Sequence, residues 1–179
     1  MKEEIIIAGF GGQGVLSMGK ILAYSGLMDD KEVTWMPSYG PEQRGGTANV
    51  TVILSDDKIS SPVLDRYDIV IALNQQSLDK FGEKVKAGGI LIYDTNGIHK
   101  HPTRDDIKIY PINAMEATLE IGNSKAYNMV VMGALLEAMD YKLPMENVIK
   151  GLKKSLPERH HKLIPLTEQA IEKGRELIK

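Results

Sequence analysis

The chain has 179 residues, 42% of them apolar, which suffices for one domain with a substantial core and falls short of two full domains. Its 22 basic and 24 acidic residues give a formal charge of −2 without a lysine-rich block, a balance that argues against nucleic acid as a partner. Cysteine is absent, so the chain cannot form a disulfide, use a cysteine nucleophile or bind an iron–sulfur cluster through thiolates.

The amino-terminal sequence MKEEIIIAGFGG passes from a short apolar run directly into a glycine turn, without the long hydrophobic region and cleavage site of a signal peptide. No stretch of the chain approaches the length needed to span a membrane. We therefore expect one cytoplasmic domain over residues 1–179 that has no membrane contact.

The first half alternates β-branched runs with helical patterns, as expected of parallel strands joined by right-handed crossovers. Residues 5–8 form an apolar run too short for a helix, which predicts a buried first strand. The apolar residues of 15–27 fall on one helical face, and residues 32–36 predict a second strand. Polar and apolar residues alternate over 47–54, which predicts a strand with one wetter face before a turn at 55–58.

The pattern continues toward the middle of the chain. The apolar run 69–73 predicts a further buried strand, followed by a polar helix over 75–85. Glycines then indicate a turn at 87–89, and two more strands are expected at 90–93 and 107–110.

The second half is mainly helical. The segment AYNMVVMGALLEAM, residues 126–139, is apolar on nearly every side, which predicts a helix buried in a core or against a partner. Amphipathic helices are expected over 144–156 and 165–178, each with a proline at its start. The fold class is therefore α/β: a Rossmann-like, mostly parallel sheet flanked by helices, with a helical C-terminal part.

A glycine motif lies between the first strand and the first helix. Gly9, Gly11 and Gly14 have the G-x-G-x-x-G spacing, which exposes backbone N–H groups and a positive helix end to an anion. A dinucleotide site also needs an acidic residue at the end of the second strand, but that strand ends TWMPS; a P-loop would need lysine where Val15 stands. Two interpretations stay open: binding of a phosphate-bearing group, or a tight turn that only packs.

The carboxyl ends of parallel strands collect polar residues at one edge of the sheet, where ligands bind in such folds. The residues expected at this edge are Gln13, Ser38, Tyr39, Asn74, Gln75, Asp94, Thr95 and Asn96. The loop PSYGPEQRGG, residues 37–46, adds Arg44, whose planar fork suits a carboxylate, a phosphate or a partner subunit. Solvated loops also produce polar rims of this kind.

Sites of other classes are not indicated. His99, His101 and the pair 160–161 lack the i, i+4 arrangement of a zinc enzyme, so we expect no metal site. No G-x-S-x-G elbow marks a hydrolase serine, and we expect no catalytic residue in this chain.

Four segments together resemble the gamma subunit of 2-oxoacid:ferredoxin oxidoreductases: AGFGGQGV, PSYGPEQRGGTANVTVILSD, ALNQQSLDKF and NMVVMGALLEA. The resemblance implies a complex that oxidatively decarboxylates a 2-oxoacid, with 2-oxoglutarate favoured over pyruvate, to an acyl-CoA with reduction of ferredoxin. It also implies that thiamine diphosphate, Mg and Fe-S clusters lie in alpha, beta or delta subunits, with no cofactor bound by this chain alone. The isolated chain could form a homodimer.

Two roles follow from the resemblance. The chain is either a docking subunit or a subunit that binds coenzyme A; a stand-alone nucleotide- or CoA-binding Rossmann-like protein is the alternative. The expected ligand-binding or interface residues are Gly9, Gly11, Gly12, Gln13, Gly14, Ser38, Tyr39, Arg44, Gly45, Gly46 and Asn74.

Overall fold

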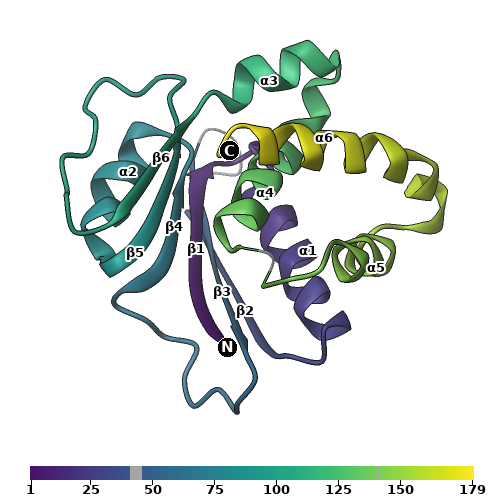
Figure 1. The fold of residues 1–179 in the computed structure, drawn as a ribbon, viewed down its shortest axis with the longest axis horizontal. Coiled ribbons are helices and arrows are strands. Elements are labelled where there is room, and N and C mark those ends of the chain that lie inside the picture. The colour runs from purple at the N-terminus through teal and green to yellow at the C-terminus, as the bar shows by residue number, and fades with distance from the viewer. Residues whose placement is uncertain (41–45, 141) are drawn as a thin grey trace.

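A computed structural model describes residues 1–40, 46–140 and 142–179. Six strands in the described chain form one sheet in the order β2-β3-β1-β4-β5-β6 (Figure 1). The strands are β1 (Lys2–Phe10), β2 (Glu32–Tyr39), β3 (Thr47–Ser55), β4 (Tyr67–Ala72), β5 (Val85–Asp94) and β6 (Lys108–Ile112). Each strand expected from the sequence is present.

The sheet is mostly parallel, as predicted, and β3 is the exception. Strand β1 pairs in parallel with β4, β4 with β5, and β5 with β6, whereas β3 is antiparallel to both β1 and β2. The expectation of crossovers throughout the first half is wrong at this point. Residues 40–46 are too few for a crossover helix, so β2 and β3 form a hairpin. The carboxyl ends of β1 and β2 nevertheless share one edge, since each is antiparallel to β3.

Helices cover both faces of the sheet. They are α1 (Val15–Met28), α2 (Gln75–Phe81), α3 (Ala114–Ile121), α4 (Tyr127–Ala138), α5 (Met145–Ser155) and α6 (Ile164–Glu176). Short 3-10 segments lie at Gly82–Lys84, Ser124–Ala126 and Glu158–Leu163. Helices α1, α4, α5 and α6 lie on one side, and α2 covers the other (Figure 1).

Alternation along the strands builds two cores. In β1, Ile5 and Ile7 join the core beneath α1 and α4, while Ile6 and Ala8 join the core beneath α2. The predicted wetter face of β3 is wrong at Thr51, which is 3% exposed, because both faces of the sheet are covered there.

Helix α4 is buried on nearly all sides, which confirms the prediction for this segment. Val130, Val131 and Leu135 are each 0% exposed. The helix has the sheet on one side and α6 on the other, so an amphipathic pattern would have left polar groups in the core.

One predicted turn is also wrong. The segment 87–89 lies inside β5, where the pairing with β4 shifts register between Tyr67 and Ile69. Gly88 has φ of 77°, and its N–H donates to the Asp106 carbonyl at 2.7 Å. The glycines thus permit an irregularity within a strand. The helix expected over 75–85 is also shorter than predicted: α2 ends at Phe81.

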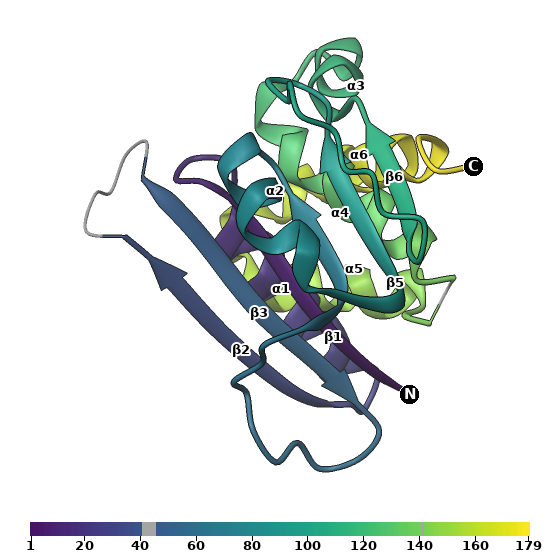
Figure 2. The same cartoon turned by 90° about the vertical axis from the view of Figure 1, so that its left-hand side faces the viewer.

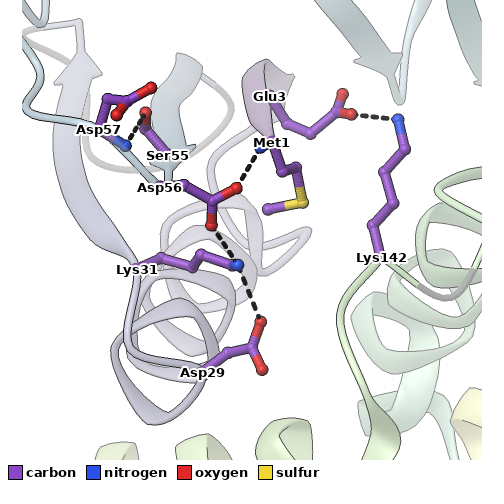
Figure 3. A network of polar contacts seen from close by, with 8 residues as sticks. All are labelled: Met1, Glu3, Asp29, Lys31, Ser55, Asp56, Asp57 and Lys142. Carbon is purple, nitrogen blue, oxygen red and sulfur yellow. Dashed lines mark hydrogen bonds and ion pairs between the residues drawn. The ribbon is translucent and has the colours of Figure 1, made fainter.

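Ion pairs lie at the end of the sheet opposite the glycine turn, where β1 and β2 begin. Figure 3 shows Asp56 accepting from Lys31 and from the Met1 amino group, and Glu3 paired with Lys142. The Asp56 contacts join the starts of β1 and β2 to the end of β3, and the Glu3–Lys142 pair joins β1 to the segment between α4 and α5. The candidate ligand cavity lies at the other end of the sheet.

Candidate ligand cavity at the glycine turn

A cavity of about 510 Å³ lies between the glycine turn and the β2–β3 hairpin. The turn and the first residues of α1 form one wall, and the hairpin base forms the other. Its described lining comprises Phe10, Gly11, Gly12, Gly14, Val15, Leu16, Ser17, Tyr39, Gly40, Gly46, Thr47 and Ala48. The cavity thus unites two segments that the sequence predicted separately as ligand-binding.

The turn is held in shape by the side chain of Gln13. The N–H of Phe10 donates to Gln13 Oε1 at 2.6 Å, and Gln13 Nε2 donates to the Leu73 carbonyl at 3.2 Å. One side chain therefore ties the ends of β1 and β4 to the turn. Gln13 does not line the cavity, so the structure gives it a supporting position.

Gly9, Gly12 and Gly14 each have a steric reason to be glycine. A Cβ on Gly9 would stand 2.5 Å from Gln13 Oε1, and one on Gly14 would stand 2.7 Å from Asn128 Nδ2. Gly12 and Gly14 have φ of 94° and 77°, which side chains rarely adopt. The motif thus serves close packing, and this need is independent of any ligand.

The amino end of α1 is nevertheless open to an anion. Gly14 precedes the helix without a side-chain cap, and its first turn holds no acidic residue. The first N–H groups of a helix have no partner within it, and here they belong to Val15, Leu16 and Ser17, which all line the cavity. Together with the helix dipole, they make a favourable place for a phosphate.

One backbone hydrogen bond fixes the hairpin base to the turn, and a second closes the base of the hairpin itself. Gly11 N–H donates to the Gly46 carbonyl at 2.8 Å, and Gly40 N–H donates to the Thr47 carbonyl at 3.1 Å. Tyr39 is 69% exposed at the cavity mouth. Ser38 is exposed without lining the cavity. The predicted residues Arg44 and Gly45 lie outside the described residues.

Asn74 has a structural position at the start of α2. Its Oδ1 accepts from Ser77 N–H at 2.8 Å, which caps this helix. The side chain is 6% exposed and does not line the cavity; within the described chain, Nδ2 has no hydrogen-bond partner. Gln75 instead holds the loop that follows β5, because its Oε1 accepts from the N–H groups of His99 and Lys100.

Asp94 was expected among the polar residues at the carboxyl edge of the sheet, but it is not part of a solvent-exposed rim. It is 1% exposed, and its Oδ2 accepts from the Tyr127 hydroxyl at 2.6 Å. Burial raises the pKa of Asp94, while hydrogen bonds from Tyr127, Asn96 N–H and Ala114 N–H act in the opposite direction. Burial, with Asp94 close by, also raises the pKa of Tyr127. This carboxylate joins β5 to the starts of α3 and α4.

Other site classes are not indicated. Among the described residues there is no group of three or more His, Asp or Glu side chains that could hold a metal ion. None of the described helices is long and apolar enough to cross a membrane.

The profile of the family described as pyruvate ferredoxin/flavodoxin oxidoreductase matches residues 4–177. The chain belongs to this family. The expected resemblance is thereby confirmed.

Two kinds of curated members of the pyruvate ferredoxin/flavodoxin oxidoreductase family are similar to this chain: one has about its length, and the other is much longer. The 2-oxoglutarate synthase subunit KorC of Methanothermobacter marburgensis is 34% identical over 99% of this chain and 97% of its own length. The ketoisovalerate oxidoreductase subunit VorA of Methanothermobacter thermautotrophicus is 36% identical over 97% of this chain. The chain spans only 36% of that VorA, and 28% of the VorA of M. marburgensis.

Solved structures share the fold. The gamma subunit of a keto/oxoacid ferredoxin oxidoreductase from Geobacter sulfurreducens has a TM-score of 0.83 at 28% identity, covering 99% of this chain and 97% of that one. The 2-oxoglutarate:ferredoxin oxidoreductase from Magnetococcus marinus, solved with 2-oxoglutarate, coenzyme A and succinyl-CoA bound, has a TM-score of 0.87 at 25% identity. It covers 99% of this chain and 31% of that one.

Several residues at the cavity were not predicted from the sequence. Leu16 and Ser17 lie in the first turn of α1, and Thr47 begins β3. Their position directly after the glycine motif was a usable signal for the first two. Asn128, which packs against Gly14 from α4, had no such signal because 114 residues separate the two in sequence.

Proposed function

We propose that this chain is the gamma-type subunit of a 2-oxoacid:ferredoxin oxidoreductase, with 2-oxoglutarate as the 2-oxoacid. The correspondence with KorC along nearly the whole of both chains carries the proposal. In this proposal, alpha and beta subunits, with or without a delta subunit, hold thiamine diphosphate, Mg and Fe-S clusters and pass electrons to ferredoxin. The absence of cysteine agrees with that division, since this chain offers no thiolate ligand.

Within the complex, the cavity at the glycine turn would bind the phosphate-bearing end of coenzyme A. Three features support this assignment. The first-turn residues of α1 line the cavity, no acidic side chain stands in that turn, and Gly12 leaves open space beside it. Backbone N–H groups at a helix end suit phosphate oxygens, whereas the apolar side chains of Val15 and Leu16 suit the non-phosphate part of a ligand.

The variant pair Ser17→Asp and Ser17→Asn tests this assignment. Ser17 is exposed in the first turn of α1 and lines the cavity. Aspartate adds a negative charge beside the expected phosphates, while asparagine has the same shape without the charge. An acidic side chain at this position also stabilises the helix by about 0.3–1 kcal/mol, so weaker binding could not be attributed to a damaged fold.

The assay is ferredoxin reduction by the assembled complex with 2-oxoglutarate, at varied concentrations of coenzyme A. We expect Ser17→Asp to raise the KM for coenzyme A about tenfold over Ser17→Asn, equivalent to about 1.4 kcal/mol, with the same KM for 2-oxoglutarate. Equal KM values for coenzyme A in the two variants would refute the cavity assignment. No assembly of the wild-type chain with an oxidoreductase partner would refute the subunit assignment itself.

A docking-only role is the second candidate, and the glycine geometry favours it. Gly9 and Gly14 are each required by a side chain of this same chain, Gln13 and Asn128, so packing alone accounts for both. That role predicts an assembled complex whose KM for coenzyme A does not respond to the charge at Ser17.

A further inference from the structure

A second hollow lies away from the glycine turn, between α1 and β2. It has a volume of about 390 Å³ and is lined by Lys20, Ala23, Tyr24, Leu27, Val33 and Trp35. Leu27 is 49% exposed and Trp35 is 41% exposed, although both are large apolar side chains. We call these six residues the α1–β2 groove. Apolar surface of this kind on a soluble chain indicates a contact that is completed by another molecule.

The groove runs along an open edge of the sheet. Among the described strands, β2 pairs with β3 alone, and Figure 2 shows it as the outermost strand on that side. One row of backbone N–H and C=O groups on an edge strand points outward and lacks a partner in the sheet. This strand has eight residues, and Glu32 is its one charged residue.

The two edges of the sheet differ in their protection. The opposite edge strand, β6, has five residues and carries Lys108 and Pro111, features that limit pairing with other chains. Strand β2 has Pro37 near its carboxyl end, which removes one N–H donor and leaves Glu32–Met36 as the stretch able to pair. A hydrophobic edge strand with an uninterrupted stretch of this length promotes aggregation unless a partner covers it.

In some family members, the partner is part of the same chain. VorA and the M. marinus enzyme carry the same unit in chains of which it is 36% and 31%, so further protein of the same enzyme accompanies the unit there. The charge of the groove adds a second criterion. Lys20 lines it and takes part in no salt bridge within the described residues, so a carboxylate of the partner would complement it.

A second copy of the chain fits less well. A two-fold contact centred on Trp35 would bring the groove of each copy onto that of the other, and with it two Lys20 ammonium groups. Like charges facing each other at a buried contact cost affinity.

We infer that the α1–β2 groove and the β2 edge are the docking site for an extended segment of the catalytic oxidoreductase protein. That segment adds a strand beside Glu32–Met36, places an apolar side chain in the groove and directs a carboxylate to Lys20. This inference rests on the proposed function and assigns that function a specific surface.

Two charge variants of the groove and two controls test the surface in the complex formed by coexpression with the chain that matches the remainder of VorA. Trp35→Glu places a charge in the groove, and Lys20→Glu reverses the exposed charge without touching the core. Leu119→Glu is the matched control, because Leu119 is 67% exposed on α3 and lies outside the groove. We expect each groove variant to weaken association at least tenfold, with Leu119→Glu and Lys20→Arg close to the wild type.

Hydrogen exchange of the backbone amides reports strand addition directly. We expect peptides covering Glu32–Met36 to become protected on assembly, while peptides from α3 exchange as in the isolated chain. Unchanged exchange in β2 on assembly, or unchanged affinity of both groove variants, would overturn the docking site and leave the subunit assignment intact. A wild-type chain that does not associate would overturn both.

Sedimentation of the isolated chain tests the second-copy alternative. A monomer at all concentrations supports the inference. A dimer that Trp35→Glu dissociates would overturn it, since the groove would then hold another copy.

Discussion

The substitution Gly174→Ala tests the closest helix crossing in the core. A Cβ on Gly174 in α6 would stand 1.8 Å from the Val130 carbonyl oxygen of α4. Reciprocally, a Cβ on Gly133 in α4 would stand 1.9 Å from the Ile171 carbonyl oxygen of α6. The clashing atoms belong to the backbone, so a change of side-chain rotamer cannot relieve the overlap.

The separation required sets the magnitude. Ordinary contact begins near 3.4 Å, so the Val130 oxygen and the new methyl group must move apart by 1.6 Å. A gap of 0.5–1 Å already forfeits roughly a quarter to a half of each dispersion contact, and here the surrounding side chains are fully buried. Overpacking typically costs about 1–3 kcal/mol and occasionally more, and the better helix propensity of alanine returns about 1 kcal/mol. Because backbone meets backbone, we expect a net loss of about 2–4 kcal/mol in the free energy of unfolding.

Denaturant unfolding followed by circular dichroism measures this loss. It corresponds to a decrease in Tm of roughly 5–15 °C for a chain of this size. The matched control is Gly82→Ala, because Gly82 has φ of −57° and its nearest neighbour for a Cβ, Leu78 Cδ1, stands at 3.5 Å. A Gly174→Ala protein as stable as the wild type, or one no less stable than Gly82→Ala, would refute the reasoning.

Two further predictions concern ionisable groups. Tyr127→Phe removes the hydroxyl that donates to Asp94 at 2.6 Å, and we expect a loss of about 1–3 kcal/mol in unfolding free energy. Because burial raises the pKa of Asp94, stability falls as pH rises through that pKa, and the loss in the variant should grow as pH is raised above the usual carboxyl range; a loss that does not change with pH in unfolding titrations would contradict this. At Asp56, a hydrogen bond from Lys31 and another from the Met1 amino group lower the pKa from 3.8 to about 2. The stabilisation is present above the unfolded pKa and disappears as pH falls toward 2, so the difference in Tm between wild type and Asp56→Asn should vanish there and shrink in high salt; a constant difference would contradict the ion pair.

Local patterns determined the elements of this protein. The apolar run at 5–8 predicted β1 because a segment buried on both faces has few polar residues. The segment 126–139 predicted the buried helix α4 for the same reason. The glycine spacing at 9–14 predicted the turn between β1 and α1, since positive φ angles and close approach require glycine there.

Errors arose where a local signal had two structural meanings. The glycines at 87–89 indicated a turn, but the neighbouring strands kept β5 continuous through an irregularity. Asp94 at a strand end indicated a wet rim, but α4 covers it and supplies Tyr127. In both cases the deciding neighbour lies far away in sequence.

The sequence by itself therefore determined the α/β class, the six strands in chain order and the turn on which the candidate site is built. Only the tertiary structure decided that β3 lies antiparallel between β1 and β2, because strand pairing depends on contacts that no local pattern encodes. That arrangement brings the hairpin base to the glycine turn to form the cavity, and it leaves β2 at the open edge beside α1. The residues of the cavity and of the α1–β2 groove are given by the sequence, but only the fold brings these distant segments together.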